Sequence, residues 1–430
     1  MSAAFFWMLA ALIFLFSAGT PVGIALIASG IFYLLMSGND LGLAAEQIMN
    51  GLYNNYVILA VPMFIFASRV ASAGSMMDRL VELASVLVGW WRGGLAHVNV
   101  VASLILSGMS GSAVADAAGI GRLLIEMMTK KGRYSEAYAA AVTATSAVIG
   151  PIVPPSIPMV LYALVSGASL GALFLGGVVP GLLMALTLMA VIYFTARRRG
   201  FSVDERFAWE RLGSAFGRAF LALFTPVILL GGIYSGAFTP TEAAAVASAY
   251  TLLLVGAIYR DIGLSEIYAV FRDALRDSTV VLTIIAGSFL LNYIITIERI
   301  PHRLLAAVGQ YDLGPLGTIL LLNFVFLILG MFLDASVLLL VGIPIVMPIV
   351  NAAGIDLVLF GVVIVLNIMI GLVTPPFGVL LFIVKGLVEA PMSAIVREAL
   401  PLLFALVVSL LLLIFFPDLV LWLPALWRGQ

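Results

Sequence analysis

Cysteine is absent from this chain of 430 residues, and histidine occurs only twice. Without thiols the protein can form no disulfide, no iron–sulfur cluster and no Cys-ligated zinc site. The two histidines, His97 and His302, are isolated in the sequence, so a histidine-based metal centre is not expected. The composition therefore argues against transition-metal chemistry.

Charge is also scarce: Asp, Glu, Lys and Arg make up 10% of the chain, and hydrophobic residues make up 63%. Soluble domains carry about 25% charged residues. A spanning helix needs about 20 apolar residues, so the length allows roughly ten to thirteen membrane segments and no soluble domain. No basic run suggests a nucleic-acid partner. The apolar N-terminal stretch lacks a positive leader and predicts a retained first helix.

Two stretches with the pattern Gly-x-x-x-Pro-Pro, at 150–155 and 371–376, lie inside long apolar segments. A double proline removes two backbone donors and interrupts an α-helix. In lipid the freed carbonyls need protein, water or an ion as partners. Each stretch therefore predicts a broken helix with unwound backbone at membrane depth. A matched pair of such breaks is typical of the binding site of a secondary transporter.

Other landmarks recur at a similar offset of about 220 residues, which indicates an internal repeat. Thr20-Pro21 recurs as Thr239-Pro240, and Asp116 recurs as Asp334. Asp116 follows a Gly/Ser-rich stretch that predicts the tip of a re-entrant helical hairpin at 94–129, and Asp334, in the stretch 330–336, marks the corresponding tip of a second hairpin at about 315–350.

Basic residues flank the first hairpin, at Arg92 and at 130–133, so its open end should face the cytoplasm. No Lys or Arg occurs between Arg303 and Lys385, so the second hairpin should open outward. The fold class predicted is an all-α polytopic membrane protein with two inverted repeats, each with a re-entrant hairpin and a broken helix. The predicted parts are scaffold 1–92, hairpin and broken helix 93–167, scaffold 168–310 with a charged linker at 197–218, hairpin and broken helix 311–390, and a scaffold helix at 391–430.

The stretches Ser110–Asp116, Ile149–Pro158 and Gly371–Gly378 resemble the large membrane subunit of the tripartite ATP-independent periplasmic (TRAP) transporters, the DctM family. The resemblance implies sodium-coupled import of an organic acid, such as a C4-dicarboxylate or a sialic acid, across the bacterial inner membrane. It also implies an elevator mechanism and two partners, a periplasmic substrate-binding protein and a small four-helix membrane subunit on a separate chain. It implies no cofactor, with Na⁺ as the coupling ion. The architecture is also similar to that of divalent-anion/sodium symporters.

Sodium binds hard oxygen ligands, which unwound carbonyls, hydroxyls and carboxylates supply. Each hairpin tip is expected to face its own break across a sodium ion. The substrate is expected between the tips, where helix N-termini offer N–H donors. The predicted sodium ligands are Ser110, Gly111, Ser112, Gly150 and Pro154 at the first site, and Gly330, Asp334, Asn367, Gly371 and Thr374 at the second. The predicted substrate residues are Ser110, Ser112, Asp116, Pro155, Ser156, Ser336, Pro375 and Pro376.

Structural roles compete with these assignments. The aspartates could cap helices or stabilise the tips, the serines could allow close helix packing, and the prolines could simply kink helices. Rival functions are a stand-alone divalent-anion/sodium symporter, an intramembrane aspartyl protease that uses Asp116 and Asp334, and a channel or purely structural subunit.

Overall fold

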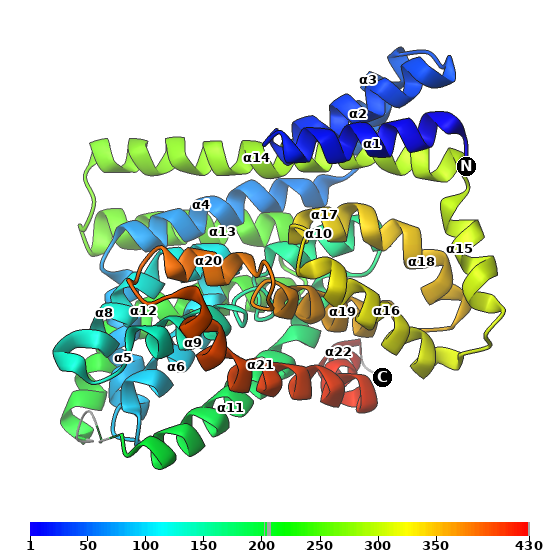
Figure 1. The fold of residues 1–430 in the computed structure, drawn as a ribbon. Coiled ribbons are helices and arrows are strands. Elements are labelled where there is room, and N and C mark those ends of the chain that lie inside the picture. The colour runs from blue at the N-terminus through cyan, green and yellow to red at the C-terminus, as the bar shows by residue number, and fades with distance from the viewer. Residues whose placement is uncertain (202, 204–207, 429–430) are drawn as a thin grey trace.

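The computed structural model describes residues 1–201, 203 and 208–428, and within these ranges it is built from helices (Figure 1). Arg92 and Val203 form an isolated antiparallel bridge, and the described residues contain no strand. Seven of the described helices are long and apolar enough to cross a membrane. The all-α polytopic fold predicted from the sequence is confirmed.

The first half of the chain contains a helical pair, a further spanning segment, hairpin 1 and a broken helix. The elements are α1 (Ala3–Ser17), α2 (Val22–Ser37), α3 (Gly42–Tyr53), a 3₁₀ turn (Tyr56–Leu59), α4 (Ala60–Ala73), α5 (Met76–Val88), α6 (Gly94–Ser110), α7 (Ala113–Ala118), α8 (Ile120–Thr129), a 3₁₀ turn (Lys130–Gly132), α9 (Glu136–Ala147), α10 (Ile157–Ser166) and α11 (Leu170–Arg199).

The second half repeats this order. Its elements are α12 (Trp209–Tyr234), α13 (Pro240–Leu253) with a π turn (Leu254–Ile258), α14 (Leu264–Ile297), α15 (Ile300–Gly309), α16 (Gly314–Gly330), α17 (Ala335–Val337) with a π turn (Leu338–Gly342), α18 (Ile343–Ala352), α19 (Leu357–Gly371), α20 (Val379–Lys385), α21 (Met392–Phe415) and α22 (Asp418–Arg428).

The two hairpins enter the molecule from opposite ends. Hairpin 1 consists of α6, a tip at Gly111-Ser112, α7 and α8; hairpin 2 consists of α16, a tip at 331–334, and α17 to α18. Figure 1 places α8 towards the left of the view, and α16 and α18 towards the right. The inverted arrangement expected from the charge bias is therefore present.

Side-chain caps define where the second arm of each hairpin begins. The Ser112 hydroxyl accepts a hydrogen bond from the backbone N–H of Ala115 (3.4 Å), and the Asp334 carboxylate accepts one from Ser336 (2.8 Å). Such caps satisfy N–H groups that a helix cannot pair internally. The counterpart of Asp334 in the first repeat is therefore Ser112. The sequence-based pairing of Asp334 with Asp116 was wrong, because Asp116 lies inside α7.

The linker between the repeats is shorter than predicted. The charged stretch was placed at 197–218, but α11 continues to Arg199 and α12 begins at Trp209. The charges misled the prediction because Arg197–Arg199 form the last turn of a helix, where cations complement the helix dipole. Residues 202 and 204–207 of this stretch lie outside the described part. The division into scaffold and hairpin-bearing parts stays a prediction.

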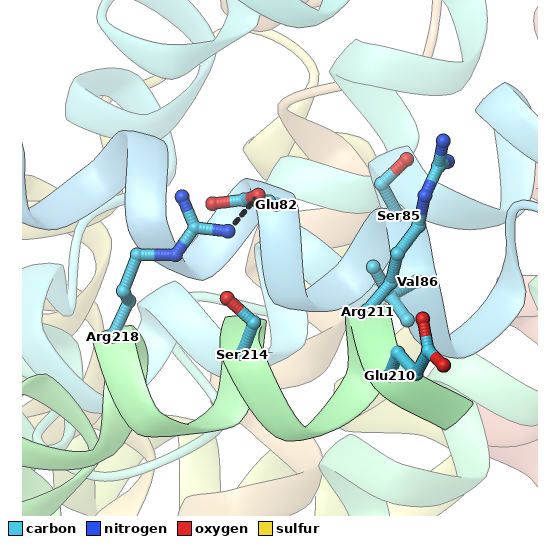
Figure 2. A pocket seen from close by; sticks show the side chains of 7 residues that line it. All are labelled: Glu82, Ser85, Val86, Glu210, Arg211, Ser214 and Arg218. Carbon is cyan, nitrogen blue, oxygen red and sulfur yellow. Dashed lines mark hydrogen bonds and ion pairs between the residues drawn. The ribbon is translucent and has the colours of Figure 1, made fainter. Parts of the chain in front are cut away.

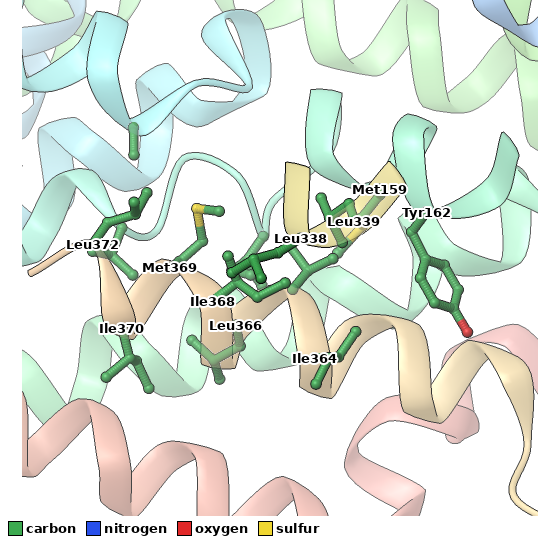
Figure 3. Packing of buried hydrophobic residues seen from close by; sticks show 14 of the residues in the cluster. Met159, Tyr162, Leu338, Leu339, Ile364, Leu366, Ile368, Met369, Ile370 and Leu372 are labelled. Atoms are coloured by element: carbon green, nitrogen blue, oxygen red, sulfur yellow. The ribbon is translucent and has the colours of Figure 1, made fainter. Parts of the chain in front are cut away.

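Apolar packing joins the two repeats around α19. Leu338 and Leu339 of hairpin 2 and Met159 of α10 lie beside α19, as Figure 3 shows. The hydroxyl of Tyr162 donates to the carbonyl of Leu357 (2.8 Å), and a Cβ at Gly361 would meet the Tyr162 ring. Half-helices of both repeats therefore share one core, and this core holds the tips and breaks near one another.

Candidate functional site

A cavity of about 560 Å³ lies between the two hairpin tips. Its walls come from both tips, from the start of α10, and from α4 and α14. The volume is within the range of roughly 300–1,000 Å³ that is typical of small-molecule sites. The polar residues that line it are Ser68, Arg69, Ser72, Ser110, Ser112, Asp277, Asp334 and Ser336.

The tip of hairpin 1 rests directly on the first break. Gly111 has φ +58°, which glycine adopts without strain, and a Cβ there would collide with the carbonyl of Pro155. The backbone N–H of Ile157 donates to the Gly111 carbonyl (3.4 Å). The hydroxyl of Ser156 caps α10 by accepting from Met159 (3.2 Å), and it donates to the carbonyl of Pro151. Local hydrogen bonds thus replace the helical ones that the prolines remove.

Behind this tip lies a buried carboxylate. Asp116 is 5% exposed, and its Oδ2 has no hydrogen-bond partner. A Cβ at Gly150 would collide with this oxygen, so the carboxylate lies against the unwound backbone of the first break. The hydroxyl of Ser110 is also buried and lies close enough to interact with the Asp116 carboxyl, but it makes no hydrogen bond of standard geometry. Unpartnered buried oxygens are costly, which makes this a candidate cation site.

The second break meets hairpin 2 through two glycines. A Cβ at Gly371 would lie 2.7 Å from the carbonyl carbon of Gly330, so α16 and α19 touch backbone to backbone. One turn earlier, the amide N–H of Asn367 donates to the carbonyl of Asn323 (2.9 Å). The side-chain oxygens of both asparagines are buried and have no partner. This break therefore also has two free oxygens beside it.

The structure brings together most of the residues predicted for the site. Every predicted sodium residue lies on its tip, on its break or, for Asn367, one turn before the break. Thr374 donates its hydroxyl to the carbonyl of Ile370 (2.7 Å). Among the predicted substrate residues, those that line the cavity are Ser110, Ser112 and Ser336, whereas Asp116, Pro155, Ser156, Pro375 and Pro376 do not line it. The individual roles of all these residues stay predictions.

Sequence reasoning missed one charged pair. Nε of Arg69, in α4, donates to Oδ2 of Asp277, in α14 (2.7 Å), and the pair lines the cavity opposite the tips. Ionisable residues within spanning segments are uncommon and are usually functional. A lone arginine in the apolar segment 57–73 was the signal that could have identified this position.

A smaller cavity of about 390 Å³ lies between α5 and α12 (Figure 2). An ion pair between Glu82 and Arg218 crosses it. None of the predicted site residues lines this cavity. It is therefore separate from the candidate site.

The inverted repeats, the paired breaks and the cavity between two hairpin tips define a secondary-transporter class of membrane protein. The two aspartates of the rival protease hypothesis do not face one cavity, because Asp334 lines it and Asp116 does not. Residues 8–419 match the family model of the "Tripartite ATP-independent periplasmic transporter, DctM component". The chain belongs to this family, and so it is a multi-pass inner-membrane component of a transport system and not an enzyme.

The chain is 40% identical over 413 residues to the sialic acid TRAP transporter large permease protein SiaM of Vibrio cholerae, with 96% of each chain covered. It is 37% identical to the C4-dicarboxylate TRAP transporter large permease protein DctM of the same organism, with 96% of this chain and 95% of that protein covered. The YdaH transporter of Alcanivorax borkumensis has a similar fold, with a TM-score of 0.61 and 13% identity, over 85% of this chain and 86% of that one.

Proposed function

We propose that this chain is the membrane carrier of a sodium-coupled, binding-protein-dependent importer of an organic acid. The observation that carries the proposal is that four of the buried side-chain oxygens without hydrogen-bond partners lie at the two breaks: Ser110 Oγ and Asp116 Oδ2 at the first, and Asn323 Oδ1 and Asn367 Oδ1 at the second. Oxygen-only donor sets of this kind suit sodium.

The mechanism follows from where these oxygens lie. A sodium ion at each break would be coordinated by these oxygens, would balance the charge of Asp116 at the first break, and would hold the tip against the break. The cavity between the tips would then receive a carboxylate that meets the free N–H groups of the tips. Loaded and empty states would differ in the free energy of crossing the membrane, and that difference is sufficient for coupling. An elevator motion of the hairpin-bearing part against the remaining helices would carry the site across.

The substrate class rests on the relatives, which are named for sialic acid and C4-dicarboxylates. Both ligands are carboxylates. We propose that a periplasmic binding protein delivers the acid and that a separate small membrane subunit completes the carrier.

Transport in proteoliposomes tests the proposal. The chain would be purified with its small subunit, and uptake of labelled sialic acid or succinate would be measured with the matching binding protein outside. We expect saturable accumulation against a gradient that is lost when external sodium is replaced by potassium. Uptake by the chain alone would instead favour a stand-alone anion symporter, and uptake that never exceeds equilibrium would indicate a passive channel.

A further inference from the structure

The cavity between the tips contains one positive side chain among the described residues that line it, Arg69. The other charged residues there are Asp277 and Asp334, both negative. An anionic substrate that enters this cavity would therefore meet two carboxylates and one cation. Since like charges repel, the position of that cation should decide where a carboxylate can rest.

The Arg69–Asp277 pair contributes little to holding its two helices together. The side chains are 48% and 38% exposed, and an exposed ion pair stabilises a fold by about 0–1 kcal/mol. The helices α4 and α14 also pack through apolar contacts, such as the edge-to-face rings of Phe66 and Phe271 (6.0 Å). Because apolar contacts already hold the two helices together, packing alone does not account for an ionisable pair in spanning segments, where such residues usually line a water-filled cavity or a substrate pathway.

The geometry of the pair leaves part of the guanidinium available. Nε and Nη2 of Arg69 both point at the same oxygen of Asp277, Oδ2. Nη1 takes no part in the pair. A guanidinium can bind a carboxylate through two parallel N–H donors, which a lysine ammonium cannot do. Arg69 can therefore hold a second carboxylate while Asp277 keeps it in place.

We infer that Arg69 binds the carboxylate of the transported acid and that Asp277 is its positioning residue. This inference rests on the proposed function and extends it with a specific anion contact outside both hairpins, one that belongs to this conformation and is released when the hairpin-bearing part moves past α4. Asp277 fixes the direction of the guanidinium and balances its charge while the cavity holds no substrate. Hydroxyls of Ser68 and Ser72 line the same wall and add polarity next to the anion.

The test compares variants of the whole carrier, assembled with its small subunit and binding protein, by sodium-driven uptake of sialic acid or succinate. We expect Arg69→Gln to raise the half-saturating concentration at least 10-fold, and Arg69→Lys to raise it by less. Asp277→Asn should raise it by less than Arg69→Gln does, because the guanidinium stays but is no longer held in direction, and an unchanged value would remove the positioning role of Asp277. The exchanged pair, R69D with D277R, should not recover wild-type uptake, because the guanidinium then projects from the opposite helix.

The matched control is Arg218→Gln, which breaks an ion pair of similar exposure, 51% and 41%, at the other cavity. It should leave half-saturation unchanged. Melting temperatures in detergent would show that each variant is folded.

Wild-type half-saturation in Arg69→Gln would overturn the inference. Full recovery by the exchanged pair would also overturn it, since the pair would then be only a bridge between helices. Failure of the wild-type carrier to show sodium-driven uptake of either acid would instead count against the proposed function.

Discussion

Hairpin 1 with its break, called unit 1 below, and hairpin 2 with its break, called unit 2, follow one backbone plan but differ in burial. Residues 148–156 of the first break are buried except for partly exposed Val153, whereas Pro376 and Phe377 of the second are exposed. Where unit 1 has Ser110 and Ser156, unit 2 has Phe332 and Phe377 at the equivalent positions of tip and break. Those two rings lie 5.4 Å apart, and each residue is 55% exposed.

From this difference in burial we propose that the two units have different roles. In unit 1 the carboxylate lies behind the tip, buried against Gly150, while in unit 2 it lies on the tip and faces the cavity. The buried carboxylate is suited to holding an ion for a long time, and the exposed tip is suited to opening. Unit 2 is therefore the unit that we expect to admit the substrate in this conformation.

The largest effect is expected at Gly371 of unit 2, where the packing leaves no space for a side chain. Gly371→Ala would place a Cβ 2.7 Å from the carbonyl carbon of Gly330, and only backbone movement could relieve that contact. We expect a loss of about 2–3 kcal/mol in stability, measured by thermal unfolding in detergent. The control is Gly330→Ala at the same crossing, whose Cβ would have its nearest neighbour at 3.5 Å and should change stability by less than about 1 kcal/mol. Equal losses of stability in the two variants would show that the backbones of α16 and α19 are not in close contact at this crossing.

Some features of the two units can be predicted from the sequence, and others cannot. The double prolines, the Gly/Ser-rich tip of hairpin 1 and the charge bias identified the breaks, that hairpin and the inversion, because each is a local requirement of backbone or membrane, and hairpin 2 followed from the internal repeat. The pairing of Asp116 with Asp334 was wrong because similar residues near a tip need not share a helical register. The burial of unit 1, and the contact of Arg69 with Asp277, depend on how distant helices pack, and no local pattern carries that information.

The next effect concerns the two carboxylates. Asp116→Asn removes a charge that is buried without a donor on Oδ2, so we expect sodium affinity to fall at least about 10-fold. Asp334→Asn removes an exposed charge and keeps an oxygen that can cap α17, so a fall of about five-fold or less is expected. Sodium-dependent uptake and sodium-induced shifts in melting temperature measure both. A larger effect at Asp334 would assign the tighter ion site to unit 2.

A smaller effect is expected when Asn367, whose side-chain oxygen has no hydrogen-bond partner, is compared with its counterpart Ser146, whose hydroxyl has one. Asn367→Leu removes an amide oxygen that has no partner. It also removes the hydrogen bond that the amide N–H donates to the carbonyl of Asn323. Without sodium its stability should change by about 1 kcal/mol or less, but the stabilisation by sodium should shrink. Ser146→Ala is the equivalent change in unit 1. There the hydroxyl already donates to Asn99 (2.7 Å), so we expect a loss of about 1 kcal/mol that is the same with and without sodium. Unchanged sodium stabilisation in Asn367→Leu would remove Asn367 from the ion site.

The smallest effect belongs to the exposed ring pair that distinguishes unit 2. A double-mutant cycle with Phe332→Ala and Phe377→Ala should give a coupling of about 0.5 kcal/mol, the low end of the contribution of aromatic pairs, because both residues are exposed. Loss of the pair should also free the tip. Because the chain has no cysteine, a single Ser336→Cys reports directly on access to the cavity by its rate of thiol labelling. We expect labelling at this position to become faster in Phe332→Ala, while Ser110→Cys in unit 1 keeps its slow rate. Equal acceleration at both positions would mean that the two tips open together, and the contrast between the units would then be one of burial alone.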